Sequence, residues 1–263
     1  MALSNLFGTL VEGKYWEAPH TEMKNPIGAV TRTKDGRTYV YARAGGTIGL
    51  GDVTVAAPDA FAVAATYFGA AVGDAPAAGE GGAIGDVKIR HCVVTGTLTM
   101  LADEYADGLL VITDGTGEGQ AIPLRRTEAN GAAGSSFLYL AHPLQVALSN
   151  SSVGQIVKNP WADVVAATHK NAGGDPGEIV VGVCQVAGVT TTLKYFWVQT
   201  YGLTALQAGA ATILVAAPVI IDEAVAGSAQ APVATETIIQ TFGVAMVDIA
   251  DTIFGAVYLQ IRP

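Results

Sequence analysis

Short apolar runs, separated by clusters of glycine, aspartate, asparagine and serine, recur along the whole chain. In residues 37–43 (RTYVYAR) long amphipathic side chains alternate with small ones, and residues 109–113 (LLVIT) begin with four apolar residues in succession. Alternation with a period of two is typical of a half-buried strand, and a short apolar run bounded by turn residues is typical of a buried one. The pattern therefore predicts strands along most of the chain.

The same criteria predict about a dozen short strands joined by glycine-rich turns. The predicted strands lie at 37–43, 52–56, 93–100, 109–113, 137–140, 153–157, 179–186, 193–200, 212–216, 235–241 and 256–261. Many short strands of this kind indicate an all-β fold, either a sandwich or a barrel.

The clearest local signal is in residues 105–124 (YADGLLVITDGTGEGQAIPL). Its apolar run is followed by the glycine-rich sequence 114–119 (DGTGEG) and then by a second run, 120–124 (QAIPL). Glycine supplies the positive φ that hairpin turns require, and Asp-Gly is a strong hairpin dipeptide. The segment therefore predicts a strand, a tight turn and a second strand.

Residues 1–25 lack the alternation and are predicted to form an extended arm. In assembled proteins such arms often reach a neighbouring subunit, whereas a frayed terminus is the alternative. Tyr15 and Trp16 are candidate anchors in the arm, and Tyr39 and Tyr41 are candidate contact residues in the first predicted strand. These four aromatic residues are the predicted interface residues.

The remainder, residues 26–263, is predicted to form one β-rich domain, or two lobes within it. A faint repeat relates residues 28–58 to residues 182–218. Both segments begin at glycine, pass through an aromatic strand and end in Val-Ala-Ala-Pro. Duplication is one explanation of this likeness. Chance similarity in a chain rich in alanine and glycine is the other.

The charge of the chain argues against nucleic acid as a partner. The net charge is −9, from 14 Lys and Arg against 23 Asp and Glu, and only 14% of the residues are charged. Binding to phosphates requires clustered cations. The densest basic groups, at 88–90 and 125–126, are each too small for a nucleic-acid groove.

Residues 195–221 contain no charged residue and are long enough to span a bilayer. Glutamine, glycine and proline interrupt the segment, however, so buried strands are predicted and a membrane helix is not. The start of the chain lacks the features of a secretory signal.

The sequence offers no recognisable catalytic or cofactor site. The four histidines lack metal-ligand spacing, no serine lies in a nucleophile elbow, and the glycine-rich segments lack a phosphate-loop pattern. Cys92 and Cys184 could pair, although buried free thiols are the favoured interpretation. An acidic group could hold a structural cation, but solvated turn carboxylates are more usual. Its members are Asp103, Glu104, Asp107, Asp114 and Glu118. We therefore expect no enzyme, no cofactor and no metal.

Three stretches carry a resemblance to a known group of proteins. They are residues 105–124, residues 137–161, and residues 195–202 together with the closing segments 243–245 and 254–259. They resemble virion structural proteins of tailed bacteriophages, in particular capsid-decoration (cement-type) proteins of environmental phages. No catalytic residue is carried over by this resemblance.

The resemblance implies a non-enzymatic, β-rich protein on the outer surface of an icosahedral phage capsid. Such a protein binds the major capsid protein and stabilises contacts between its subunits. A homotrimer, synthesis in the host cytoplasm and location in the virion are implied in the same way. A charge-poor chain suits this role, because a cement protein acts through many repeated contacts.

Two other classes of function stay open on the sequence. A tail, collar or head-fibre component would have the same composition and turns. A carbohydrate-binding β module would expose aromatic side chains, with Trp16, Trp161, Trp197 and the tyrosines as candidates, although core packing or interface anchoring explains these residues too.

Overall fold

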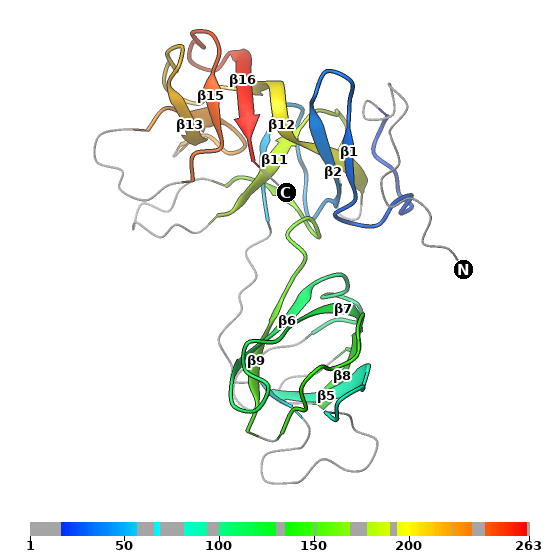
Figure 1. Cartoon of the computed structure of the whole chain (residues 1–263). Coiled ribbons are helices and arrows are strands. Elements are labelled where there is room, and N and C mark those ends of the chain that lie inside the picture. The colour runs from blue at the N-terminus through cyan, green and yellow to red at the C-terminus, as the bar shows by residue number, and fades with distance from the viewer. Residues whose placement is uncertain are drawn as a thin grey trace. The chain divides into compact units, whose positions relative to one another are not determined.

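The computed structural model describes most of the chain, and within that part the protein is all-β. The described residues are 17–56, 66–68, 82–93, 100–129, 135–149, 151–168, 178–189, 194–222, 224–232 and 240–261. They contain strands β1 to β16 and no helix (Figure 1). The all-β prediction is therefore confirmed.

The strands are short, with the exception of β12. Their bounds are β1 (Val30–Arg32), β2 (Thr38–Arg43), β3 (Val53–Val55), β4 (Thr66–Phe68), β5 (Lys88–Val93), β6 (Leu109–Asp114), β7 (Ala121–Thr127), β8 (Ser135–Leu140), β9 (Val153–Val157), β10 (Val165–Ala166), β11 (Val180–Cys184), β12 (Tyr195–Gln207), β13 (Pro218–Ile221), β14 (Ala229–Gln230), β15 (Gly243–Ala245) and β16 (Phe254–Gln260).

One predicted strand is wrong. Residues 212–216 form a turn with a single bridge between Ile213 and Ile249. Ala216 has a φ of 64°, which ends any extended run, and the strand begins only at Pro218. Most of the predicted strands at 93–100 and 235–241 lies outside the described residues.

The chain divides into two compact units. Unit 1 comprises residues 1–58 and 160–263, and unit 2 comprises residues 59–159, which are inserted between them in the sequence. The sequence predicted one β-rich domain over residues 26–263, or two lobes within it. It did not predict where the two units begin and end. Within the described ranges, no helix is long and apolar enough to cross a membrane.

Unit 1 is built around β12. The sheet has the order β10-β3-β11-β12-β16-β15-β13-β14, and β2 joins it by pairing with β12 and β1. The 13 residues of β12 are shared among three neighbours: Tyr195–Tyr201 pair with β2, Val198 and Gln199 with β11, and Tyr201–Gln207 with β16. The pairing of β12 with β2 shifts register between Gln199 and Tyr201. At the same point, pairing of β12 with β11 ends and pairing with β16 begins.

The buried Gln199 side chain satisfies the backbone beside this irregularity. Its Nε2 donates to the carbonyl oxygens of Tyr201 (3.2 Å) and Leu203 (2.9 Å). Buried carbonyl groups need such donors, because an unpaired one costs about 1–3 kcal/mol. Inward-facing residues of β12, among them Val198 and Leu206, are fully buried in the core of the unit.

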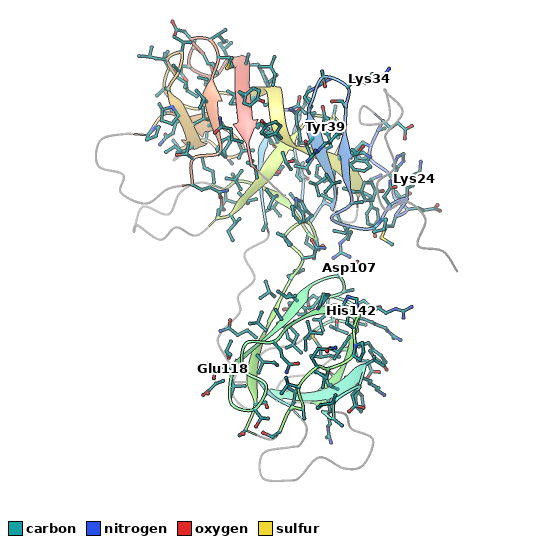
Figure 2. The ribbon with its side chains drawn as sticks, in the orientation of Figure 1. Lys24, Lys34, Tyr39, Asp107, Glu118 and His142 are labelled. Carbon is teal, nitrogen blue, oxygen red and sulfur yellow. The ribbon has the colours of Figure 1, made fainter. Side chains whose placement is uncertain are left out.

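Unit 2 is a closed barrel of six strands in the order β4-β5-β8-β7-β6-β9, paired antiparallel throughout. Its inward side chains include Ile89, Leu110, Leu124 and Leu138, which form one apolar cluster. The hairpin predicted at 105–124 is β6, a turn and β7, and Glu118 at its tip points into solvent (Figure 2).

The described part of the predicted arm is attached to unit 1. His20 exchanges two backbone hydrogen bonds with Tyr195 (2.8 and 2.9 Å), and the Lys24 N–H donates to the Tyr41 hydroxyl (3.1 Å). The Tyr41 N–H then donates to the Ala29 carbonyl oxygen (2.8 Å). Residues 20–29 are therefore held against β2 and β12, whereas residues 1–16 lie outside the described residues.

The turn between β6 and β7 provides a test of local packing with a matched control. Gly115 and Gly119 have φ values of 79° and 86°, so alanine is strained at both. A Cβ on Gly115 would lie 2.3 Å from the Ser151 carbonyl oxygen, whereas a Cβ on Gly119 would meet nothing within 4 Å. We expect Gly119→Ala to cost about 1 kcal/mol and Gly115→Ala about 3 kcal/mol of unfolding free energy in urea melts. Equal costs would contradict this packing.

The insertion of unit 2 provides a second test. Strands β3 and β10 pair antiparallel with Val55 opposite Val165, so the chain leaves unit 1 and returns to it at neighbouring strands. We expect a chain in which a short glycine linker replaces residues 59–159 to keep the fold of unit 1. Circular dichroism and a cooperative thermal transition would measure this. A truncated chain that is unfolded would show that unit 1 depends on the barrel.

Candidate interaction surface

The outward side of the sheet around β12 and β16 carries a continuous row of uncharged side chains. Leu203 of β12 lies opposite Tyr258 of β16, Tyr258 lies opposite Val244 of β15, and Val244 lies opposite Pro218 of β13. Cross-strand partners point to the same side of a sheet. Four strands therefore contribute to a single row.

Neighbouring positions extend this row into a surface that we call the outer face. Leu203 is 51% exposed, Phe254 is 49% exposed and Met246 is 50% exposed. The outer face comprises Tyr201, Leu203, Ala205, Gln207, Pro218, Val244, Met246, Phe254, Ala256, Tyr258 and Gln260. None of these residues is charged. Antiparallel sheets normally present polar residues to water, so an exposed apolar face of this kind is typical of a contact surface.

Two tyrosines lie side by side in the outer face. The rings of Tyr201 and Tyr258 meet edge to face, with centroids 5.5 Å apart. A side-chain hydrogen bond with Tyr201 raises the pKa of Tyr258 above its ordinary value of 10.0. Tyrosine combines a large apolar ring with a polar tip, which suits contacts that are desolvated in a complex.

One end of the outer face continues into exposed apolar loops with acidic residues among them. The exposed fractions are 63% for Leu214, 55% for Val215 and 55% for Ile253. Asp248 lies in the same loops and accepts a hydrogen bond from the Val215 N–H (2.7 Å). An uncharged centre beside a charged margin is the usual anatomy of a protein–protein interface.

The two predicted interface residues that the structure describes, Tyr39 and Tyr41, are not part of this surface. Tyr39 is 0% exposed and Tyr41 is 1% exposed. The Tyr41 ring stacks on Tyr195 with centroids 6.1 Å apart, and it meets the Trp197 ring edge-on at 5.0 Å. Both tyrosines are thus core residues of unit 1 and offer no surface to a partner in this conformation.

The other two predicted interface residues, Tyr15 and Trp16, lie outside the described residues. The sequence does contain a signal for the outer face. In residues 254–260 (FGAVYLQ) apolar side chains occupy both alternate sets of positions, and no residue is charged. That pattern is typical of a strand covered on both sides, whereas Phe254 on the outward side of β16 is 49% exposed.

The acidic group predicted as an alternative cation site serves the turns of unit 2. The Glu104 carboxylate accepts the Leu101 N–H (2.8 Å) and lies 3.7 Å from the Lys158 ammonium. Asp103 accepts the Thr127 N–H at 3.3 Å. Across the described residues, no three or more His, Cys, Asp and Glu side chains are grouped so that they could hold a metal ion.

The described cysteine thiol is not activated. Cys184 is a buried free thiol, and burial raises its pKa to about 12. Its Sγ donates to the Val186 carbonyl oxygen at 3.2 Å. A thiol of this pKa is almost entirely protonated at neutral pH and is a poor nucleophile. The side chain of Cys92 lies outside the described residues.

The barrel brings together cations that are separate in the sequence. Lys88 lies opposite Tyr139, and its Nζ is 3.7 Å from the centroid of the Phe137 ring. Arg126, on the other side of Tyr139, lies 5.5 Å from that ring and also pairs with Asp103 at 3.3 Å. The two basic groups that the sequence keeps apart thus form one small cluster in the fold, and part of it is paired internally.

No protein-family model, curated protein or solved structure matches this chain. The fold and its surface define an all-β protein of two units, the first of which carries an exposed, uncharged sheet face.

A partly buried carboxyl group of unit 1 provides a test of pH dependence. Burial raises the pKa of Asp52 above its ordinary value of 3.8, although its Oδ2 accepts the Gly49 N–H at 2.6 Å. The folded state therefore holds a proton that the unfolded state releases. The resulting stabilisation is fully present below pH 3.8 and is lost as the pH rises through the higher pKa of the folded state.

We expect Asp52→Asn to remove this part of the pH dependence. The amide oxygen can still accept the Gly49 N–H without a buried charge, so the variant should gain stability relative to the parent between acid and neutral pH. Urea melts at a series of pH values would measure the difference. A variant that loses stability evenly at all pH values would contradict the desolvation argument.

Proposed function

We propose that this protein is a non-enzymatic virion structural protein that binds the outer surface of a phage capsid. In this role it stabilises contacts between subunits of the major capsid protein. The observation that carries the proposal is the outer face, because an exposed apolar sheet without charge is suited to burial against another protein. The resemblance of residues 105–124 to capsid-decoration proteins is the reason for proposing a phage capsid as the particle to which the protein binds.

The energetics of such a role favour this composition. Each copy binds weakly through a surface of modest size, and several contacts per assembled unit multiply the effect. A protein that binds the assembled lattice in preference to free subunits stabilises the lattice by mass action. The trimeric state and the location in the virion belong to the same proposal through the resemblance.

A tail, collar or head-fibre component would use the same kind of surface, so it is the alternative within this class. The carbohydrate-binding alternative gains no support from the two tryptophan candidates that the structure describes. Trp197 contacts Tyr41, and Trp161 packs against the apolar core of unit 1. These two rings are engaged in the fold and do not form an open platform for a sugar.

The proposal is tested on phage heads with and without the purified protein. We expect saturable, symmetric binding to preformed heads and a rise in the temperature at which they release DNA, because the bound form of the lattice is stabilised. Quantitative gel analysis would give the bound copies, and a DNA-binding dye would report release on heating.

Heads incubated with a heat-unfolded sample of the same chain are the control. Binding confined to one vertex or to the tail would move the protein to the collar or fibre alternative. The absence of any particle association, together with measurable affinity for a glycan, would overturn the proposal in favour of the carbohydrate module.

A further inference from the structure

We propose that the outward side of the barrel in unit 2 binds an acidic segment of a partner protein. The binding surface is a group of cations that we call the basic cluster, which comprises Lys88 and Arg90 of β5 and Arg125 and Arg126 of β7. The inference goes beyond the proposed function, because it concerns a different unit and does not use the outer face. The two proposals are therefore tested separately.

The pairing of three neighbouring strands brings these cations together. Strand β8 lies between β5 and β7, and its Tyr139 is opposite Lys88 on one side and Arg126 on the other. Arg90 lies opposite Phe137, in the next outward row. At about 4.8 Å between strands and 3.3 Å per residue, the backbone positions of the cluster span roughly 10 by 7 Å. The cluster is thus compact enough to contact one short segment.

A β-bulge adds a second arginine to the same row. The pairing of β7 with β8 shifts register between Leu124 and Arg126, so Arg125 is an extra residue on β7. Leu124 and Thr127 are both buried, and the two arginines between them are both exposed. Regular alternation would turn one arginine inward, whereas a bulge lets both point outward. A guanidinium group can bind a carboxylate through two parallel hydrogen bonds, so the bulge provides two such donors side by side.

Two aromatic rings hold the cations in position. The Lys88 Nζ lies 3.7 Å from the centroid of the Phe137 ring and 5.5 Å from that of Tyr139. The Arg126 guanidinium carbon is also 5.5 Å from the Tyr139 centroid, and the Tyr139 hydroxyl donates to Glu128 (2.6 Å). Cation–π contacts restrict the side chains before a ligand arrives, which lowers the entropy lost on binding. A base or a sugar would have to displace these cations in order to stack on the rings, so the arrangement favours a ligand bound by its charge.

The charge of unit 2 selects a short acidic segment. Within the part of the chain that the structure describes, Arg126 pairs with Asp103, whereas no carboxylate pairs with Lys88 or Arg125. Four of the five Lys and Arg residues in 59–159 belong to the cluster, and the same residues include ten Asp and Glu. A nucleic acid carries phosphates along its whole length and would extend beyond the cluster into this negative field. A protein segment with a few carboxylates matches the charge and avoids that repulsion.

The experiment measures binding of the full-length chain to a labelled peptide of about ten residues in which glutamate alternates with threonine. Alternate residues of an extended peptide are about 6.6 Å apart, which matches the spacing of the two outward rows. Fluorescence anisotropy at low and at physiological salt would be recorded for the parent, Lys88→Gln, Arg125→Gln and the double variant. The control, Arg32→Gln, removes the same charge at an exposed strand position of unit 1. A thermal melt would establish that each variant is folded.

We expect the parent and Arg32→Gln to bind the peptide equally well. Lys88→Gln and Arg125→Gln should each raise the dissociation constant about threefold to fivefold, and the double variant at least about tenfold, because each removes one exposed charge pair. Salt should weaken binding of the parent more than binding of the double variant, since screening acts on the pairs that the variant lacks.

A parent that does not bind the peptide at low salt would overturn the inference. So would equal binding by the cluster variants and the control, or equal binding of a peptide in which glutamine replaces every glutamate. Tighter binding of a single-stranded oligothymidine or of a polyuronate would assign the cluster to nucleic acid or to an anionic glycan, and the inference would again be wrong.

Discussion

The hydrogen bonding of β12 is the constraint on which the rest of unit 1 depends. This strand has 13 residues, more than twice the usual length, and its backbone needs partners along both edges. Strand β11, which precedes β12 in the chain, supplies some of them, and β2 and β16 supply the others from distant parts of the sequence. The change of neighbour creates an irregularity at Gln199, whose own amide donates to the carbonyl groups beside it. The sheet is complete only when all three neighbours are in place.

The two halves of β12 differ in what covers their outward side. Beside the first half, the backbone N–H of Lys24 donates to the Tyr41 hydroxyl, and the Tyr41 ring packs on the rings of Tyr195 and Trp197, so Tyr41 is almost fully buried. Beside the second half, Leu203 and its neighbour Phe254 are about half exposed. Aromatic and aliphatic residues occur on both halves. Whether they become core or surface is thus decided by a segment that crosses one half only.

Unit 2 differs from unit 1 in the way its strand edges are paired. Its six strands close into a barrel, so no strand presents a free edge for pairing. Closure also gathers cations from β5 and β7 around the rings of Phe137 and Tyr139. Asp103 pairs with Arg126 and partly neutralises this cluster.

The sequence by itself determined the secondary structure class, because periods of two and glycine turns act locally. The hairpin at 105–124 and the strand at 153–157 were predicted for that reason. Contacts between distant segments decided the rest. Ala216 ends an apparent strand, β3 and β10 flank an inserted barrel, and Tyr39 and Tyr41 become core residues. Only the tertiary structure exposed the outer face, because an apolar strand looks the same in sequence whether one of its sides or both are covered.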